Sequence, residues 1–377
     1  MQTNSAPHKI LIVRFSSIGD IVLTTPVIRC VKEQLGAEVH FLTKAGFRGI
    51  LEHNPHLTKV WSIKKDIDEV AAGLQQAGFT SVIDLHNNLR CRILSFKLWH
   101  AKFYRFNKLN REKWLLTNLK VNRLPDVHIV QRYLAAATPL GVVDDGKGLE
   151  YYPGDAVVDY SFLGGELQRS NPNESSKGQP EHSNTEVTEK QLALTSPPAY
   201  LAFVIGAAHA TKRLTEAKII EFCRAHQGLI LLLGGTAERE QGERIAEIVG
   251  DQVINTCGKF SLHQSAVLVR DAAVVLTHDT GMMHIAAAFQ KPIVSIWGNT
   301  VPDFGMYPYL PGQEELEKGR RVEVNKLSCR PCSKIGYAEC PKGHFRCVND
   351  LDVEVIVKKI KAILDNKASY KTEKNVK

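Results

Sequence analysis

The first residues that suggest chemistry follow an apolar run near the N-terminus, in the stretch RFSSIGD at positions 14–20. A dinucleotide-binding loop at such a place carries three glycines, because its backbone must approach a pyrophosphate closely. This stretch has one glycine, Gly19, and beside it a carboxylate, Asp20. A carboxylate in this place would repel a bound phosphate, so the stretch is not an ordinary phosphate-binding loop. An aspartate at the start of a helix is often only a cap for that helix, which is the usual interpretation.

Two loops in the second half of the chain have the composition of an anion-binding site. Lys212 and Arg213 stand just before Thr215, which is typical of a residue that caps a helix. Thr280 and Gly281 stand at the start of another expected helix. Backbone N–H groups at helix N-termini favour negative charge, so the two loops together predict a diphosphate site. The alternative is that the two cations are ordinary surface side chains.

Three further side chains belong to the same region of the sequence. Asp279 and His284 flank the second loop, although a lone histidine in a helix is more often structural. Glu238 follows a Gly-Gly pair at the end of a strand and can accept hydrogen bonds from a ribose diol. The spacing also permits Glu240 in this role. The alternative is that both acids only stabilise the helix, because negative charge in a first helical turn is favourable without any ligand.

The first half contains a second polar loop, DLHNNLR at positions 84–90, with Asp84, Asn87 and Arg90 as candidates to hold a sugar acceptor. It leads into residues 89–123, which contain ten Lys or Arg and a single acid, in a chain whose net charge is +8. Aromatic residues are interleaved with these cations. The pattern favours an anionic partner, namely a phosphorylated glycolipid, a membrane surface or a nucleic acid, over a solvated basic face.

Four of the eight cysteines are close together in the sequence, at Cys329, Cys332, Cys340 and Cys347. In a cytosolic chain such a cluster suggests a structural zinc site, and the alternatives are packed free thiols or a disulfide.

The elements that must position these residues alternate between short apolar runs and amphipathic helical stretches, which predicts parallel sheets with crossover helices. Strands are expected in the first half at 10–13, 38–42, 60–63 and 81–85, and helices at 20–35, 67–77 and 127–140. Strands are expected in the second half at 200–205, 229–233, 253–255, 273–276 and 292–296, and helices at 215–226, 238–249, 262–270, 281–289 and 353–364.

The length of 377 residues suits about two domains. We predict one Rossmann-like domain over 1–163, a polar linker or insertion over 164–198, a second such domain over 199–350, and a C-terminal helix and tail over 351–377. Ligands of doubly wound sheets bind beyond the carboxyl ends of the strands, so two facing halves would form a cleft between them.

The composition, 44% hydrophobic and 23% charged, is that of an ordinary globular protein. No apolar run approaches the roughly 20 residues of a membrane span. The N-terminus also lacks the charged-then-apolar pattern of a signal peptide, so a cytoplasmic location is expected.

Taken in order, these motifs resemble glycosyltransferase family 9, the heptosyltransferases of lipopolysaccharide core assembly. The resemblance covers both halves. It rests on SSIGD followed by Thr-Pro (16–26), on the Lys-Arg pair (212–213), and on HDTGMMHIAAAFQKPIVSIWGNT (278–300). The last stretch is the most specific, because it matches the family's Asp-x-Gly-x-x-His-x-Ala-Ala-Ala signature and the Gly-x-Thr after it. Leu214 stands where the family often has a tryptophan.

The resemblance implies a GT-B fold, in which two facing Rossmann-like domains bind the acceptor on the N-terminal side and a nucleotide sugar on the C-terminal side. It also implies an inverting transfer without a metal or other cofactor, of heptose from ADP-heptose onto a lipopolysaccharide core or lipid-linked glycan. The expected partners are a nucleotide-diphosphate sugar, an anionic glycolipid and the inner face of the cytoplasmic membrane, and no nucleic acid. Another nucleotide-sugar donor or another acceptor remains open.

The same resemblance assigns roles to individual residues. Asp20 corresponds to the catalytic base, Lys212 to the phosphate-binding lysine and Glu238 to the nucleoside-binding glutamate. The expected donor site comprises Lys212, Arg213, Glu238, Asp279, Thr280, Gly281 and His284. The expected acceptor site comprises Ser17, Gly19, Asp84, Asn87 and Arg90, with Gly19 letting the chain turn so that Asp20 faces the cleft.

Two rival classes account for less of the sequence. A Rossmann-fold dehydrogenase or epimerase requires the glycine-rich loop that is absent after the first strand. A zinc-containing nucleic-acid-binding protein suits the charge and the cysteines, but it leaves DTGMMH (279–284) without a purpose.

Overall fold

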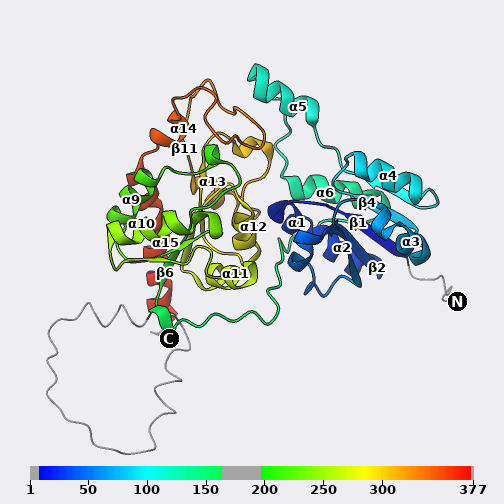
Figure 1. The fold of residues 1–377 in the computed structure, drawn as a ribbon, viewed down its shortest axis with the longest axis horizontal. Helices are drawn as coiled ribbons and strands as arrows, with labels where there is room; N and C mark the ends of the chain where they lie inside the picture. The colour runs from blue at the N-terminus through cyan, green and yellow to red at the C-terminus, as the bar shows by residue number, and fades with distance from the viewer. Residues whose placement is uncertain (1–7, 164–196, 375–377) are drawn as a thin grey trace, which may run out of the picture.

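A computed structural model describes residues 8–163 and 197–374 of the chain, with side chains described as far as residue 366. The N-terminal and C-terminal halves lie side by side, and each has a sheet of its own (Figure 1). The predicted linker over 164–198 falls almost wholly outside the described residues, so the domain boundaries stay predictions. No helix in the described ranges has the length and apolar character that crossing a membrane requires.

The N-terminal sheet is five-stranded, with the order β3-β2-β1-β4-β5, and every neighbouring pair is parallel. Its strands are β1 (Lys9–Val13), β2 (Glu38–Lys44), β3 (Lys59–Ile63), β4 (Ser81–Asp84) and β5 (Lys102–Arg105). Its helices are α1 (Ile18–Val22), α2 (Thr25–Leu35), α3 (Asp68–Ala77), α4 (Leu89–Lys97), α5 (Asn110–Trp114) and α6 (Ile129–Ala137).

The C-terminal sheet is six-stranded and parallel, with the order β11-β10-β9-β6-β7-β8. Its strands are β6 (Tyr200–Val204), β7 (Leu229–Leu233), β8 (Val253–Asn255), β9 (Val274–His278), β10 (Ile293–Trp297) and β11 (Arg321–Glu323). Its helices are α9 (Glu216–Ala225), α10 (Arg239–Val249), α11 (Leu262–Asp271), α12 (Gly281–Ala288), α13 (Glu314–Gly319), α14 (Arg346–Asn349) and α15 (Val353–Lys374). The two doubly wound sheets confirm the predicted α/β class.

Strand order fixes where each half can bind a ligand. In the N-terminal sheet the chain proceeds from β1 to β2 and β3, then returns to place β4 on the other side of β1. In the C-terminal sheet β9 returns beside β6 in the same way. Loops diverge at such switch points and leave a crevice beyond the carboxyl ends of the strands. Four of the loops that the sequence singled out, those after β1, β4, β6 and β9, therefore border the two crevices.

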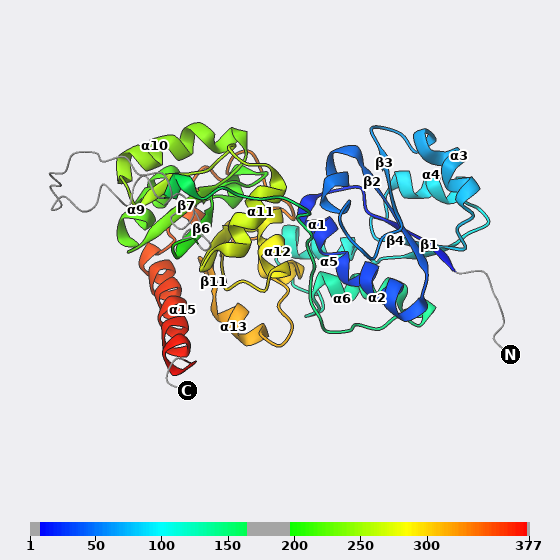
Figure 2. The same cartoon turned by 90° about the horizontal axis from the view of Figure 1, so that it is seen from below.

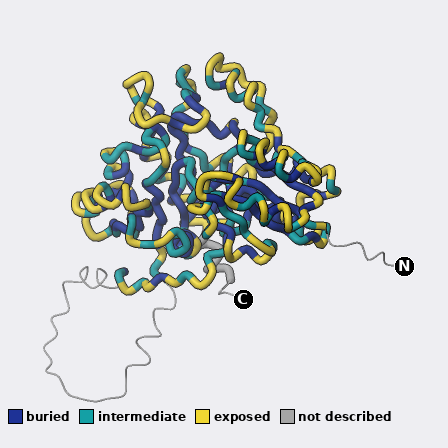
Figure 3. Tube along the Cα trace, turned by 45° about the vertical axis from the view of Figure 1, so that its right-hand side comes forward, coloured by how far each residue is buried: buried dark blue, intermediate teal, exposed yellow. Residues whose placement is uncertain are grey.

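The strands form the buried layer of each half, and the exposed surface lies mainly on helices and loops (Figure 3). One apolar cluster continues from the N-terminal half into the C-terminal half, partly through the segment after α6, which contributes Leu149, Tyr151 and Val158. Side chains of this segment also bond to α11, since the Tyr151 hydroxyl lies 3.0 Å from His263 Nδ1 and the Tyr160 hydroxyl donates to Asp271 at 2.8 Å.

One expected helix, over 20–35, is wrong as a single element, because the chain forms α1 and α2 with a break at Leu23 and Thr24. Pro26 has no N–H to donate in the first turn of α2, and the Thr24 hydroxyl bonds to the Ile21 carbonyl at 2.6 Å. The consequence is that α1 is a short separate helix. It faces α12 of the other half in both Figure 1 and Figure 2.

Candidate active site

Asp20 lies in the first turn of α1, directly after the loop that follows β1. Its Oδ1 is 2.6 Å from Nη2 of Arg14, and its Oδ2 accepts hydrogen bonds from the hydroxyl (2.8 Å) and backbone N–H (3.1 Å) of Ser17. Burial by itself would raise the pKa of Asp20, but the Arg14 charge and the Ser17 bonds outweigh it and lower the pKa below its usual value. Asp20 is therefore an ionised carboxylate at neutral pH.

Arg14 is a residue of this site that the sequence analysis passed over, although it opens the RFSSIGD stretch. Besides Asp20 it donates to the carbonyl of Leu85 at 2.7 Å, in the loop after β4. Arg14 therefore crosses the switch point between β1 and β4, and it holds the Asp20 carboxylate at the carboxyl edge of the sheet. The sequence signal that could have indicated Arg14 is its position at the end of the first strand, six residues before the candidate base.

Gly19 brings the two halves of the molecule into contact. A Cβ atom at this position would lie 2.6 Å from Cδ2 of His284 and 3.1 Å from Cα of Gly281, both in α12. A Cβ atom on Gly281 would in turn lie 2.8 Å from Cβ of Ile18. Gly19 does not have a positive φ angle, so its role is the close approach of α1 to α12 and not the turn expected of it.

We expect Gly19→Ala to lower turnover by about 10²-fold, because the new methyl group forces His284 or the whole of α12 away from Asp20. Steady-state kinetics would measure this loss, with the unfolding temperature as a check on folding. Gly46→Ala is the matched control, since a Cβ atom there meets nothing within 4 Å. Wild-type turnover in Gly19→Ala would contradict a catalytic arrangement that depends on this contact.

His284 is buried in α12 and packs against Gly19. Burial lowers its pKa to about 4, so the imidazole is neutral at neutral pH. Its Nδ1 is buried and has no hydrogen-bond partner among the described residues. The carboxylates of Asp279 and Asp20 act in the opposite direction and favour the charged imidazole, but burial outweighs them. An unpaired polar atom at this position is suited to bind a ligand, because a buried polar group without a partner costs free energy.

The loops after β6 and β9 meet at the other switch point through Lys212 and Asp279. Nζ of Lys212 lies 2.6 Å from Oδ2 of Asp279, and the Thr300 hydroxyl donates to the same oxygen at 3.0 Å. The backbone N–H of Leu214 donates to Nε2 of His278 at 3.0 Å and so ties the two loops together. Thr280 caps α12, with its hydroxyl accepting from the N–H of Met283. The expected phosphate-binding groups are thus next to one another.

Arg213 and Glu238 form a second pair beside the first, at 3.1 Å. Glu238 is buried, accepts a hydrogen bond from the backbone N–H of Gly235 at 2.9 Å, and lies against Gly206 at the end of β6. Glu240, the alternative by spacing, is exposed on α10. The structure therefore brings Glu238, and not Glu240, to the carboxyl edge of the sheet.

The expected acceptor residues after β4 lie close to this region but are engaged in holding their own loop. Oδ1 of the buried Asp84 accepts from the backbone N–H groups of His86 (3.0 Å) and Asn87 (2.7 Å). Asn87 donates to the carbonyl of Phe106 at 3.1 Å, and Arg90 donates to the carbonyl of Lys65 at 3.3 Å. None of these three is bonded to Asp20, whereas Ser17 is.

Four cations come together near Asp20, and we call them the cleft cations: Lys108 and Lys113 of the predicted basic segment 89–123, together with Arg132 and Lys334, which were not predicted. Burial, Arg132 and Lys334 lower the pKa of Lys113 to about 8, and burial and Arg14 lower that of Lys108. Nε of Arg132 is buried without a hydrogen-bond partner in the described ranges. Lys334 comes from the other half of the chain, so no local pattern could have joined it to the rest. The four positive charges repel one another, and a bound anion would relieve this repulsion.

The four clustered cysteines do not form a compact metal site in this structure. Sγ of Cys332 contacts the carbonyl of Cys329 at 3.1 Å, and burial raises the pKa of Cys332 and of Cys347 to about 11. Across the described residues, the one group of three or more His, Cys, Asp or Glu atoms within 4.8 Å of one another is Glu52, His53 and His263. The thiols therefore do not fit a preformed zinc site.

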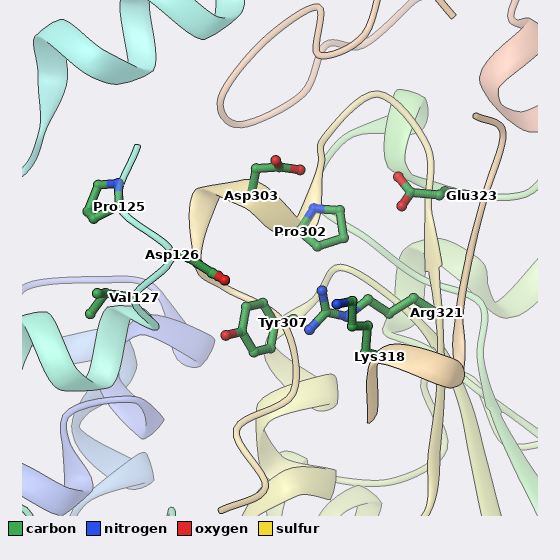
Figure 4. A pocket seen from close by; sticks show the side chains of 10 residues that line it. Pro125, Asp126, Val127, Pro302, Asp303, Tyr307, Lys318, Arg321 and Glu323 are labelled. Carbon is green, nitrogen blue, oxygen red and sulfur yellow. The ribbon is translucent and has the colours of Figure 1, made fainter. Parts of the chain in front are cut away.

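A cavity of about 240 Å³ lies beside these loops, where residues 125–127 of the N-terminal half meet residues 302–323 of the C-terminal half (Figure 4). Three of its charged groups, Asp303, Arg321 and Glu323, already have partners. The guanidinium of Arg321 lies 3.9 Å from the centre of the Tyr307 ring and bonds to Glu317, and Asn122 bonds to Asp303 at 2.7 Å. None of the predicted site residues lines it.

Comparison with known proteins decides the family. The family model for glycosyltransferase family 9 (heptosyltransferase) matches residues 67–334. The chain belongs to this family. It is 22% identical to lipooligosaccharide heptosyltransferase 2 of Haemophilus influenzae in an alignment 373 residues long, which covers 94% of this chain and 99% of that protein. Family 9 membership makes the protein a glycosyltransferase, and the rival dehydrogenase and nucleic-acid-binding classes are set aside.

Solved structures of family members have the same fold. The crystal structure of a family 9 glycosyltransferase from Veillonella parvula superposes with a TM-score of 0.67 at 18% identity, covering 95% of this chain and 98% of that one. The structure of the Escherichia coli ADP-heptose lipopolysaccharide heptosyltransferase II superposes with a TM-score of 0.63 at 18% identity, covering 96% and 99%. The predicted GT-B fold is confirmed.

Proposed function

We propose that this family 9 enzyme transfers heptose from ADP-heptose onto a lipopolysaccharide core or related lipid-linked glycan, with inversion and without a metal ion. The donor is inferred from the relatives, one of which is an ADP-heptose lipopolysaccharide heptosyltransferase. The observation that carries the proposal is the contact of α1 with α12, which sets an ionised carboxylate of one half against the phosphate-type loops of the other.

In the proposed reaction the acceptor hydroxyl loses its proton to Asp20 while its oxygen bonds to the anomeric carbon of the donor sugar. The bond from that carbon to the diphosphate breaks, and the diphosphate leaves with the electron pair. The base and the phosphate-binding loops lie in opposite halves, which suits attack on the face away from the leaving group. Arg14 and Ser17 hold the carboxylate in place, and general bases of this kind contribute about 10²–10⁴-fold in rate.

The departing diphosphate gains negative charge, which the C-terminal half can compensate with its own groups. Lys212 directs two of its contacts at Asp279, and an ammonium group has three donors, so one remains for a phosphate oxygen. The N-terminus of α12 at Gly281 and the capping Thr280 supply N–H and hydroxyl groups. We assign Arg213 and Glu238, at the ends of β6 and β7, to the nucleoside side of the donor.

The cleft cations support an anionic acceptor. Within the described part of the chain, Lys108, Lys113 and Lys334 form no ion pair. Lys108 and Lys113 lie close enough to Arg14 to be repelled by its charge, and Lys113 is attracted by Asp20. A phosphorylated or carboxylated glycolipid would relieve their repulsion while presenting a hydroxyl group to Asp20. We therefore place the enzyme in the cytoplasm, in peripheral contact with the inner face of the membrane that holds such acceptors.

The donor assignment can be tested by thermal shift with a panel of nucleotide-diphosphate sugars. A ligand at 100 times its dissociation constant stabilises the folded state by about 2.7 kcal/mol, so the preferred donor should raise the unfolding temperature most. We expect ADP-heptose to give the largest shift, and Lys212→Ala to reduce it. If another nucleotide sugar gave a larger shift, that sugar would be assigned as the donor in place of ADP-heptose. If none of them gave a shift, the proposed function would be contradicted.

A further inference from the structure

The outer face of α4 carries large apolar side chains that the fold leaves exposed. Leu89, Ile93 and Phe96 are 72%, 42% and 80% exposed, and Trp99, just beyond the end of the helix, is 83% exposed. Spacings of four and three residues place the first three on one side of the helix. We call these four residues the α4 face. Contiguous exposed apolar patches of this kind on soluble proteins commonly mark interaction sites.

The opposite side of the same helix already serves the core. Cys91, Leu94 and Leu98 are buried and pack in the apolar cluster on that side of the N-terminal sheet. The helix is thus apolar on two sides, and the N-terminal half buries only one of them. In both Figure 1 and Figure 2, α4 lies on the part of the N-terminal half that is away from the C-terminal half, which therefore does not cover the α4 face.

Cations border the α4 face. Arg92 is exposed between Leu89 and Ile93 along the helix, and Lys102 is exposed at the start of β5. Arg90 and Lys97 border the α4 face along the edge opposite to Arg92. Arg90 bonds there to the carbonyl of Lys65, and Lys97 pairs with Asp68. The helix itself carries no acid. Long cationic side chains can keep their charge at the level of lipid headgroups while apolar neighbours enter the acyl boundary.

We propose that the α4 face inserts into the interfacial layer of an anionic lipid bilayer and so holds the enzyme at the membrane. Leu, Ile and Phe supply buried apolar area, Trp99 suits the boundary between headgroups and acyl chains, and the surrounding Lys and Arg meet anionic headgroups. The inference rests on the proposed function for the membrane contact and adds the surface that makes it.

The same observations disfavour other occupants. A two-fold dimer through the α4 face would bring Arg90, Arg92 and Lys102 of one copy against those of the other, and like charges across an interface are costly. Single-stranded nucleic acid stacks on aromatic rings, but two of the four side chains of the α4 face, Leu89 and Ile93, are aliphatic and cannot stack.

Co-sedimentation with vesicles tests this proposal on the full-length protein. We expect binding to vesicles of phosphatidylcholine mixed with phosphatidylglycerol, weaker binding to phosphatidylcholine alone, and a loss of about tenfold or more in the double variant Phe96→Asp/Trp99→Asp. The matched control is Val157→Asp/Leu316→Asp, which adds the same charge at exposed apolar positions outside the α4 face and should bind as the wild type does. The tryptophan emission should shift to shorter wavelength on binding, and Trp99→Phe should remove most of that shift.

Equal vesicle binding by the α4 variant and the control would overturn the proposal, as would a dimer in solution that only the α4 variant breaks. A second measurement distinguishes a failure of the membrane proposal from a failure of the proposed function. This measurement is turnover on a water-soluble, deacylated acceptor, which needs no membrane. The α4 variant should keep that turnover, because the α4 face includes no residue placed at the active site. Loss of vesicle binding together with unchanged soluble turnover is the result expected.

Discussion

Replacing Asp20 by asparagine is expected to lower turnover by about 10²–10⁴-fold, the range that general base catalysis contributes. Asparagine keeps the size of the side chain and an oxygen that can accept from Ser17, but it cannot take a proton from the acceptor. Donor binding should change little, because Lys212 and the start of α12 lie in the other half. Steady-state kinetics with the preferred donor would measure the first effect, and calorimetric titration with the nucleoside diphosphate the second.

The control for this substitution is Asp66→Asn, which removes an exposed carboxylate from the same half without touching the loop after β1. It should leave both measurements unchanged. If Asp20→Asn turned over at the wild-type rate, Asp20 would be only a helix cap, and the base would have to be sought elsewhere.

The pH dependence of Asp20 follows from the lowered pKa. Because Arg14 and Ser17 more than offset the effect of burial, the folded-state pKa lies below the ordinary aspartate value of 3.8. The base is therefore ready for proton transfer throughout the neutral range, and its protonation should limit the rate only under acidic conditions. The same shift contributes stability that is present above the unfolded-state pKa and is lost as the pH falls through the folded-state pKa.

The sequence predicted the fold well because its signals are local. Nine strands were expected from apolar runs, and each is present within a few residues of its predicted bounds. Strand β5 and helix α4 were not predicted, because cations and aromatic residues alternate there without the period of a buried face. The apolar residues of α4 fall on two sides of the helix, which is the same feature that suggests a bilayer as its partner.

The roles of the candidate site residues stay predictions, but the structure shows which of their positions the sequence could indicate. Asp20 stands in the first turn of α1, Thr280 caps α12, and Lys212 lies in the loop between β6 and α9, so a single chain segment indicates the position of each. The pairing of Lys212 with Asp279 depends on β6 and β9 being neighbours, and the meeting of Lys113 with Lys334 depends on how the two halves pack. Spacing along the chain does not specify such contacts.

The acceptor role of Asp84 and Asn87 stays a prediction, which the structure neither supports nor excludes. Their types and their place at a strand end suggested a sugar-binding loop, yet their side chains bond to backbone groups of that loop and of Phe106. Aspartate and asparagine favour such turns for local reasons, so their presence at a strand end does not by itself distinguish a binding loop from a well-capped one.

Replacing Lys212 by alanine should weaken donor binding and slow transfer together, with a combined loss in kcat/KM of about 10–10²-fold, which corresponds to one charge-assisted hydrogen bond. Kinetics over a range of donor concentrations would measure both effects. Lys218→Ala is the control, because Lys218 is a nearby cation on α9 that pairs with Glu221 and not with Asp279. Unchanged kinetics in Lys212→Ala would contradict a phosphate role for this lysine.

The ion pair between Lys212 and Asp279 allows a second test of the phosphate role of Lys212, with a double variant. In Lys212→Ala the Asp279 carboxylate loses its cation and then repels the donor phosphate, so part of the loss comes from Asp279 and not from the missing contact. The double variant Lys212→Ala/Asp279→Asn removes that repulsion and should bind the nucleoside diphosphate more tightly than Lys212→Ala alone. Because the two residues touch, their effects should be non-additive by about 0.5–3 kcal/mol. Strict additivity would mean that Lys212 and Asp279 act on the donor independently, which their 2.6 Å separation argues against.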